Sequence, residues 1–452
     1  MADIKLKTKD ACSVPQGLPY GCTLSGAFAV LDQIVDSACL VHGPVGCAHL
    51  NLAGHRSMAF RGEKVARESA PLRPSPGAPL TARVFSTCLG EDEVIFGGEE
   101  SLREAFREVD RRFHPPLITV ISSCVSSVIG DHVEGVIGAL QGEIGASLLW
   151  VESDGFISGG FDLGVNQAYR ALIEKLVEPP KTRRPDCVNI LGEKALALEV
   201  EVNFREIERL LDRMGLRVQT RFVRRATAEG IREMAQAAFN LICSHETGLY
   251  PAQLLRERYE MPFLAADFPV GRREAREWLQ GLGQLLGREK EAEKTAQQEE
   301  EDLLQRFDPL KRLLAGKRVV VNTVDRDIVW LTDLIQLGEM ELLQVNVLPI
   351  LQAPTGPFPA NLGPIDPAIP VRPVRDLDEV ASEVARLQPD LCLGAYRIPL
   401  EREGTVFQPI PMVPAVGYRG PLELATRWQR ALKVPYREGW RRGRSYADAL
   451  WR

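Results

Sequence analysis

Short apolar runs alternate with longer segments of helical apolar spacing along almost the whole chain. The run LITVIS at residues 117–122 is typical, because a turn follows it and then a helical pattern over residues 131–144. Strand, loop and helix in regular alternation favour a parallel sheet with helices on both faces. The alternation restarts near residues 187 and 316, so we predict an α/β fold of three Rossmann-like, doubly wound parallel-sheet domains.

The chain of 452 residues is too long for a single hydrophobic core. The Pro-containing segment at residues 178–185 indicates a linker, and the charged segment at residues 288–305 indicates a helical connector with a solvated face. We therefore expect domains at residues 1–185, 186–305 and 306–452, the first with an N-terminal arm and the last with a C-terminal tail. No GxGxxG motif follows a first strand, so dinucleotide binding has no support.

The first block has its own expected order of elements. Residues 24–38 have helical apolar spacing, and the tight GPVG turn at residues 43–46 follows them. Residues 84–88 indicate a short strand, from which a loop leads to a helix over residues 99–112. We therefore expect this block to begin with one long helix.

Composition and charge narrow the class of protein. The chain has 45% hydrophobic and 26% charged residues, which is ordinary for a globular protein. Its formal net charge of -6 argues against nucleic acid as a partner. The N-terminal sequence has no apolar segment of signal-peptide length, and no run approaches a membrane span. We expect a cytoplasmic protein with neither a nucleic-acid nor a membrane partner.

Three cysteines stand in turns rather than in apolar faces: Cys22, Cys47 and Cys124. Each precedes a segment that could begin a helix, and a helix N-terminus favours the thiolate form of cysteine. Thiolates are the ligands that iron–sulfur clusters require. We therefore predict an iron–sulfur cluster held by these three thiols.

The remaining cysteines divide into two groups. Cys39, Cys187 and Cys392 lie in apolar surroundings and are expected to be small buried hydrophobes. Cys12 and Cys88 are additional, and Cys88 is either an extra cluster ligand or a loop thiol. A disulfide framework is not expected in a reducing compartment.

Several motifs together resemble the signatures of the nitrogenase component 1 superfamily. The resemblance covers nearly the whole chain, and the motifs that carry it are HGPVGC at residues 42–47, IFGGEESL at 95–102, SSCVSSVIGD at 122–131, GCTLSGA at 21–27, the segment 240–263 and GYRGPLELA at 417–425. Subunits of that superfamily have three Rossmann-like domains, in agreement with the alternation of strands and helices described above.

The resemblance also implies a site and partners. Cys22, Cys47 and Cys124 match the three thiolates that each subunit gives to a cluster at a subunit interface. That cluster is an eight-iron P-cluster-type centre (8Fe-7S) when both subunits donate three, or a four-iron centre (4Fe-4S) in other branches. The implied partners are a homologous second subunit, in an α2β2 heterotetramer, and an ATP-dependent homodimeric iron–sulfur reductase protein.

One departure from the family concerns the active-site cofactor, which catalytic subunits hold with a second-domain Cys and a third-domain His. Cys243 lies near the expected Cys position, although Ser244 could be the equivalent, and no histidine follows His245. Val and Ala cannot replace imidazole as an iron ligand. We expect the iron–sulfur active-site cofactor in the partner subunit and assign no catalytic residue. His42 and His49 flank the cluster turn, either near the sulfurs or as satisfied structural histidines.

The function implied is that of an oxidoreductase subunit. It would relay electrons from the reductase protein through the interfacial cluster to the partner's active site. Among the branches of the family, the chain best resembles the one that reduces methylthio-alkanes by C–S cleavage. One alternative is a cofactor-assembly scaffold subunit of the same superfamily. Another is a non-enzymatic partner that only binds and positions the reductase.

Overall fold

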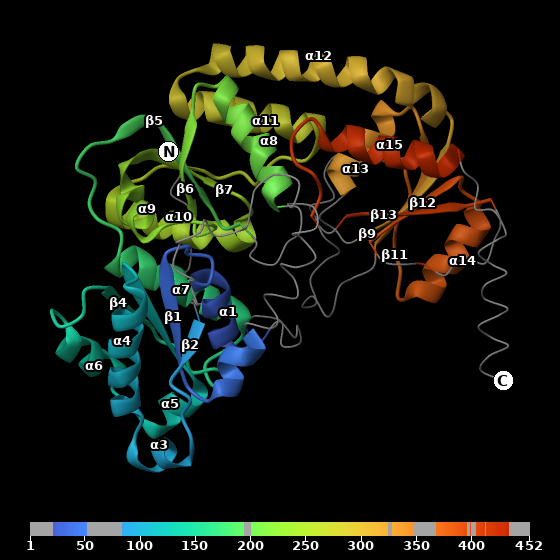
Figure 1. Cartoon of the computed structure of the whole chain (residues 1–452). Coiled ribbons are helices and arrows are strands. Elements are labelled where there is room, and N and C mark those ends of the chain that lie inside the picture. Colours follow the sequence, from blue (N-terminus) through green and yellow to red (C-terminus); the bar gives the residue numbers. More distant parts are fainter. Residues whose placement is uncertain are drawn as a thin grey trace, which may run out of the picture. The chain divides into compact units, whose positions relative to one another are not determined.

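The computed structural model describes residues 21–51, 84–193, 200–323, 328–347, 368–395, 398, 404–411 and 413–433. The chain forms two compact units, Met1–Phe268 and Pro269–Arg452. The first unit contains two four-stranded sheets and the second contains one five-stranded sheet (Figure 1). All the strand pairs are parallel. The predicted α/β fold of Rossmann-like sheets is confirmed, and domain boundaries at residues 185 and 305 stay a prediction.

The first sheet has the strand order β2-β1-β3-β4. Its strands are β1 (Ser37–His42), β2 (Val84–Ser86), β3 (Leu117–Ser122) and β4 (Ser147–Val151). Every residue of β1 and β3 is buried, because helices cover the sheet. The two strands pair in parallel as far as His42 and Ser122, so the turns that follow them leave the sheet at the same edge.

Helices on the first sheet bury narrow apolar stripes. In α4 (Glu99–Phe113) the buried residues are Leu102, Phe106 and Val109, which lie three or four positions apart and so share one face. The other helices of this block are α1 (Thr23–Leu31), α3 (Glu91–Phe96), α5 (Cys124–Ile129), α6 (Val133–Leu140) and α7 (Phe161–Lys175). Residues 45–51 are also helical.

The long helix expected over residues 24–38 is wrong. Helix α1 ends at Leu31, and the residues from Ser37 onward form the central strand β1. A short apolar run that is buried on both sides has no periodicity to distinguish strand from helix. These residues form a strand because β1 pairs with β2 and β3. Such long-range pairing cannot be predicted from the local sequence.

Helices α1 and α7 approach each other unusually closely. A Cβ atom added to Gly26 would lie 1.8 Å from the carbonyl oxygen of Phe161, and one added to Gly164 would lie 1.8 Å from the carbonyl oxygen of Thr23. Only glycine allows two helix backbones to come this near. The pair of glycines therefore fixes where α7 crosses the helix that begins beside Cys22.

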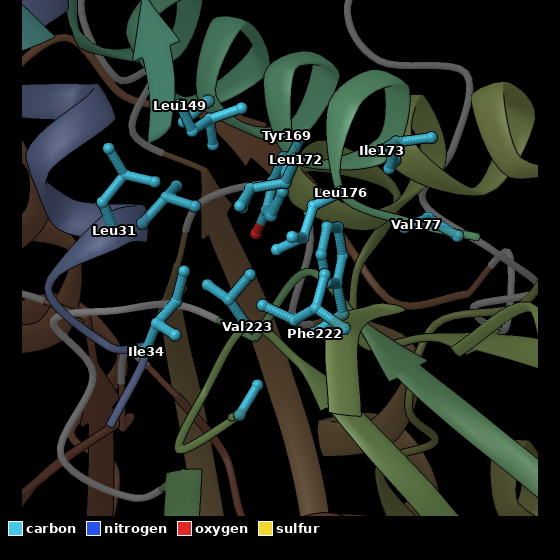
Figure 2. Close-up of a cluster of buried hydrophobic side chains, with 14 of the residues drawn as sticks. Leu31, Ile34, Leu149, Tyr169, Leu172, Ile173, Leu176, Val177, Phe222 and Val223 are labelled. Carbon is cyan, nitrogen blue, oxygen red and sulfur yellow. The ribbon is translucent and has the colours of Figure 1, made fainter. Parts of the chain in front are cut away.

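The second sheet has the strand order β6-β5-β7-β8. Its elements are β5 (Arg184–Leu191), α8 (Val200–Arg213), β6 (Arg217–Phe222), α9 (Ala228–Arg232), a short 3-10 helix (Glu233–Gln236), β7 (Ala237–Ile242), α10 (His245–Tyr259) and β8 (Phe263–Leu264). One apolar core joins this sheet to the first. Figure 2 shows Tyr169 and Leu172 of α7 beside Phe222 at the end of β6, and the Tyr169 and Phe222 ring centroids are 5.4 Å apart.

The second unit has the strand order β11-β10-β9-β12-β13. Its elements are α11 (Gly271–Leu286), α12 (Glu289–Leu314), β9 (Arg318–Thr323), α13 (Ile328–Leu337), β10 (Glu341–Val347), β11 (Val371–Pro373), α14 (Leu377–Leu387), β12 (Leu391–Gly394), β13 (Val406–Pro409) and α15 (Gly420–Lys433). Helices α11 and α12 run side by side (Figure 1). The charged connector α12 is thus one helix with a packed face, on which Leu303 and Phe307 are buried. No helix among the described residues has both the length and the apolar character to span a membrane.

Candidate metal centre

The three turn cysteines occupy equivalent places in three segments of the first unit. Cys22 immediately precedes α1, Cys47 lies in the first turn of the helical residues 45–51, and Cys124 is the first residue of α5. The last two follow β1 and β3, which end at the same edge of the sheet. This carboxyl edge is where parallel sheets usually place their ligands.

Gly155 brings Cys22 and Cys124 together. The backbone N–H and the Oγ1 of the neighbouring Thr23 both donate to the carbonyl oxygen of Gly155, over 3.2 Å and 2.8 Å. A Cβ atom on Gly155 would lie 2.9 Å from the Cβ and 3.2 Å from the Sγ of Cys124. Gly155 also has a φ of +60°, which disfavours other residues. The loop after β4 therefore contacts both cysteine segments at a position that only glycine suits.

Electrostatics place Cys47 beside the other two thiols. Burial raises the pKa of Cys47, and negative charge on Cys124 and Cys22 raises it further. The three sulfurs therefore lie near enough for their charges to interact. The expectation that a helix N-terminus favours the thiolate stays a prediction for Cys47, and burial and like charges act against it. A bound cation would reverse this balance by compensating the negative charges.

The donor set suits an iron–sulfur cluster better than a single ion. Across the described ranges, no three His, Cys, Asp or Glu side chains form a group able to hold one metal ion. The thiolates of a cluster bind different iron atoms and need not converge on one point. Three thiols are one fewer than a four-cysteine cluster requires. The residues present therefore fit three of the ligands that an iron–sulfur cluster needs.

Buried hydroxyl groups hold the cysteine segments in place. Thr23 Oγ1 lies 2.8 Å from Ser153 Oγ. Ser123 caps α5, because its Oγ accepts the N–H of Ser126 over 3.3 Å, and its own N–H donates to Ser126 Oγ over 2.8 Å. The first of these hydrogen bonds joins α1 to the loop after β4, and the other two fix the start of α5.

His42 is completely buried at the end of β1. Its Nε2 lies 2.9 Å from Asp131 Oδ2, and its Nδ1 lies 3.1 Å from Thr87 Oγ1. Burial lowers the pKa of His42, although the neighbouring Asp131 carboxylate partly offsets this by raising it. Of the two histidines that flank the cluster turn, His42 is thus the satisfied buried one, whereas His49 is exposed.

The other cysteines of the described residues differ in burial. Cys88 is exposed, and its thiol donates to the carbonyl oxygen of Ser86 over 3.6 Å. Cys12 lies outside the described residues. Cys39 and Cys392 are buried, which raises the pKa of each to about 12, as expected of inert thiols. The free thiols of the described residues include Cys22, Cys39, Cys47, Cys88, Cys124, Cys187 and Cys392.

Cys243 belongs to the second sheet. It follows β7, and its N–H donates to the carbonyl oxygen of Leu191 over 2.8 Å. The next residue, Ser244, caps α10 by accepting the N–H of Glu246 over 3.2 Å. The ring of His245 is hydrogen-bonded to Asp267. Neither Cys243 nor His245 is among the groups that act on the pKa of Cys47.

Exposed apolar side chains lie on the segments that carry or adjoin the three cysteines. We call them the apolar rim: Val45, Leu50, Val94, Ile95, Phe96, Val128, Phe156 and Ile157. They lie on the helical residues 45–51, on α3 and α5, and beside Gly155. Helices α3 and α5 pack against each other (Figure 1). Apolar groups that gather on a surface in this way are typical of a protein–protein interface.

Comparison with known proteins gives consistent matches. A family model described as nitrogenase component 1 type oxidoreductase matches residues 22–433. The nitrogenase iron-molybdenum cofactor biosynthesis protein NifE of Methanococcus maripaludis is 29% identical over 325 residues, which cover 71% of this chain and 63% of that protein. The equivalent Nostoc protein is 30% identical, over 70% of this chain and 63% of its own length.

Two further matches agree with these. A nitrogenase molybdenum-iron protein alpha chain of Methanococcus maripaludis is 28% identical, over 67% of this chain and 62% of its own length. The chain thus spans less than two thirds of the length of these relatives. A solved structure titled Nitrogenase Cp1 at pH 5 has a TM-score of 0.65 at 19% identity, and covers 91% of this chain and 88% of its own.

Proposed function

Because the chain belongs to the nitrogenase component 1 type oxidoreductase family, we propose that it is a subunit of a nitrogenase-like iron–sulfur complex. Cys22, Cys47 and Cys124 hold a cluster there. The observation that carries this proposal is that the segments of Cys22 and Cys124 both contact Gly155, while the Cys47 thiol interacts electrostatically with the other two.

Each part of the site has a task in this proposal. An iron–sulfur cluster supplies one-electron transfer when it is bound. The three cysteines provide thiolates to different irons, and the buried hydroxyls of Thr23 and Ser123 keep their backbones in place. Gly155 leaves free the space that a side chain would take beside Cys124.

Partners follow from the incomplete ligand set. Three thiolates from this chain need further ligands, and the apolar rim around them would exclude water once a second protein covered it. We propose a homologous second subunit in an α2β2 complex and an ATP-dependent iron–sulfur reductase protein as electron donor. Three thiolates from each subunit would make an eight-iron centre of the P-cluster type, and fewer from the partner would make a four-iron centre.

Two roles suit this site. In an electron-relay subunit, the cluster would pass electrons to an active site in the partner. In a cofactor-assembly scaffold, a metal cluster would be matured and then released to another protein. The relatives that are cofactor biosynthesis proteins NifE favour this role. Methylthio-alkanes as substrate remain a prediction from resemblance alone, which those relatives do not support.

The test is an iron and sulfide count, with low-temperature EPR, on the full-length chain purified with its partner. Replacing Cys22, Cys47 or Cys124 by Ala should strip the iron. Cys187→Ala and Cys392→Ala are matched controls, since both thiols are buried elsewhere, and they should keep it. Full iron retention in all three variants would refute the site, and a wild-type complex without iron would favour a non-enzymatic partner.

A second assay separates the two roles. Turnover of a methylthio-alkane with the reductase protein and ATP would support electron relay. Transfer of iron from the loaded complex to an apo-acceptor protein, with no turnover, would support the scaffold.

A further inference from the structure

Four hydrogen bonds form a continuous relay beneath the thiols. The N–H of Gly43 donates to Thr87 Oγ1 over 3.1 Å, and Thr87 Oγ1 lies 3.1 Å from His42 Nδ1. His42 Nε2 lies 2.9 Å from Asp131 Oδ2. The N–H of Gly98 donates to the other carboxylate oxygen, Asp131 Oδ1, over 2.8 Å. The relay therefore runs from Gly43 to Gly98 through three side chains.

A neutral imidazole satisfies all of these bonds. Thr87 Oγ1 accepts from Gly43 and can donate its hydroxyl proton to His42 Nδ1. The imidazole is then neutral and donates from Nε2 to the carboxylate of Asp131. The side chains of His42 and Asp131 are 0% and 2% exposed, so water cannot substitute for a lost partner.

The relay joins the segments that carry two of the thiols. Gly43 begins the turn that leads from β1 to Cys47, and Asp131 follows α5, whose first residue is Cys124. Thr87 follows β2, and Gly98 immediately precedes α4. These segments are distant in sequence, and the buried imidazole of His42 is the group that connects them.

We propose that this relay positions the turns of Cys47 and Cys124 relative to one another before any metal binds. His42, Thr87 and Asp131 are thus positioning residues, and the inference rests on the proposed role of the two thiols.

Amide hydrogen exchange tests the relay in the full-length chain as it purifies. In the Thr87→Val variant, the amide hydrogen of Gly98 should exchange about three- to tenfold faster than in the wild type. Gly98 and residue 87 are not in direct contact in the relay, so a change at Gly98 would have to pass through His42 and Asp131. The alkylation rates of Cys47 and Cys124, measured by peptide mass spectrometry, should rise by a similar factor. The thiol of Cys243 on the second sheet serves as an internal reference.

Matched variants separate a relay from a general loss of stability. Thr119→Val removes a more deeply buried hydroxyl from the same sheet, where Thr119 donates to the carbonyl oxygen of Ala38 over 3.3 Å, and should leave both readouts unchanged. Thr87→Ser keeps the hydroxyl and should behave as the wild type. Asp131→Asn should speed exchange at the opposite end, at the amide of Gly43.

The relay is refuted if Thr87→Val leaves Gly98 exchange at the wild-type rate, or if Thr119→Val accelerates it equally. These outcomes do not depend on iron. A chain that shows the expected exchange but binds no iron retains the relay and refutes only the proposed function. A chain that binds iron on the three cysteines, without the exchange effect, refutes only the relay.

Discussion

At the scale of single residues, the site depends on contacts between side chains that are far apart in the sequence. Cys22, Cys47 and Cys124 could be singled out from the sequence, because thiols in turns differ visibly from thiols in apolar strands. Gly155, Thr87 and Asp131 could not, since each acquires its importance from a partner more than thirty residues away. Asp131 does stand in the quoted SSCVSSVIGD motif, which is the only signal that pointed to it.

Gly155→Ala should remove iron from the complex. The new Cβ would meet the Cβ of Cys124 at 2.9 Å, and the φ of +60° adds strain of about 1–3 kcal/mol. Gly142→Ala is the matched control, because its φ of +89° imposes comparable strain while nothing lies within 4 Å of the new Cβ. Gly142→Ala should lower the free energy of unfolding but keep the iron. Equal iron contents in the two variants would contradict the role of Gly155.

Cys243→Ser should keep the cluster on the first sheet. Cys243 follows β7 of the second sheet and does not act on the pKa of Cys47. Iron analysis and EPR of the complex should therefore match the wild type, and most of the activity should remain. Loss of a second large cluster signal would mean that this chain holds the active-site cofactor itself.

At the scale of elements, the sequence predicted strands better where their burial pattern was long and uninterrupted. Strand β3 lies where the run LITVIS indicated it. The helical pattern over residues 24–38 overlaps the first two residues of β1. The sequence predicts a loop where α3 lies, because α3 has no buried residue and therefore no apolar stripe. Short elements that depend on tertiary neighbours leave too little local pattern to recognise.

Helix α8 should make stability depend on pH through Glu201. Burial raises the pKa of Glu201, but hydrogen bonds from Arg221 and Arg224 outweigh it and lower the pKa from 4.5 to about 2. A carboxylate with a lowered pKa contributes stability above its unfolded value, and this contribution is lost as the pH falls from about 4.5 towards 2. Urea unfolding at pH 5 and at pH 3 should show that loss.

Glu201→Gln should flatten this dependence. At pH 6 it should lower the free energy of unfolding by about 1–3 kcal/mol, because Arg221 and Arg224 lose charged partners. The exposed Glu208 lies on the same helix, and Glu208→Gln should retain the wild-type pH dependence. A Glu201→Gln variant with the full wild-type loss between pH 5 and pH 3 would show that other groups cause it.

At the scale of the whole molecule, regular alternation of strands and helices was enough to predict the fold. Parallel strands need crossover connections, so few arrangements satisfy that order. The sequence did not reveal that a single core joins the first two sheets. In that core Tyr169 contacts Phe222, and these two residues lie on opposite sides of the expected linker at residues 178–185.

The chain should require its partner to hold an intact cluster. It offers three thiols, and the apolar rim leaves Phe96 and Phe156 84% and 77% exposed. Expressed alone, the chain should contain little iron and should self-associate through its exposed apolar rim. Co-expressed with the second subunit, it should form an iron-loaded α2β2 complex. Light scattering coupled to gel filtration, with iron analysis of each peak, checks this. An iron-loaded monomer would contradict it.

The close crossing of α1 and α7 has a consequence for synthesis on the ribosome. All three thiols precede α7, and α7 ends at Lys175, so the site can be assembled as soon as that helix has left the exit tunnel. About 15–55 s pass between the synthesis of Lys175 and that of residue 452, at roughly 5–20 residues per second. During that time the nascent chain carries a complete set of free thiols exposed to oxygen. Protection must therefore reach it while translation is still under way, ahead of the partner subunit.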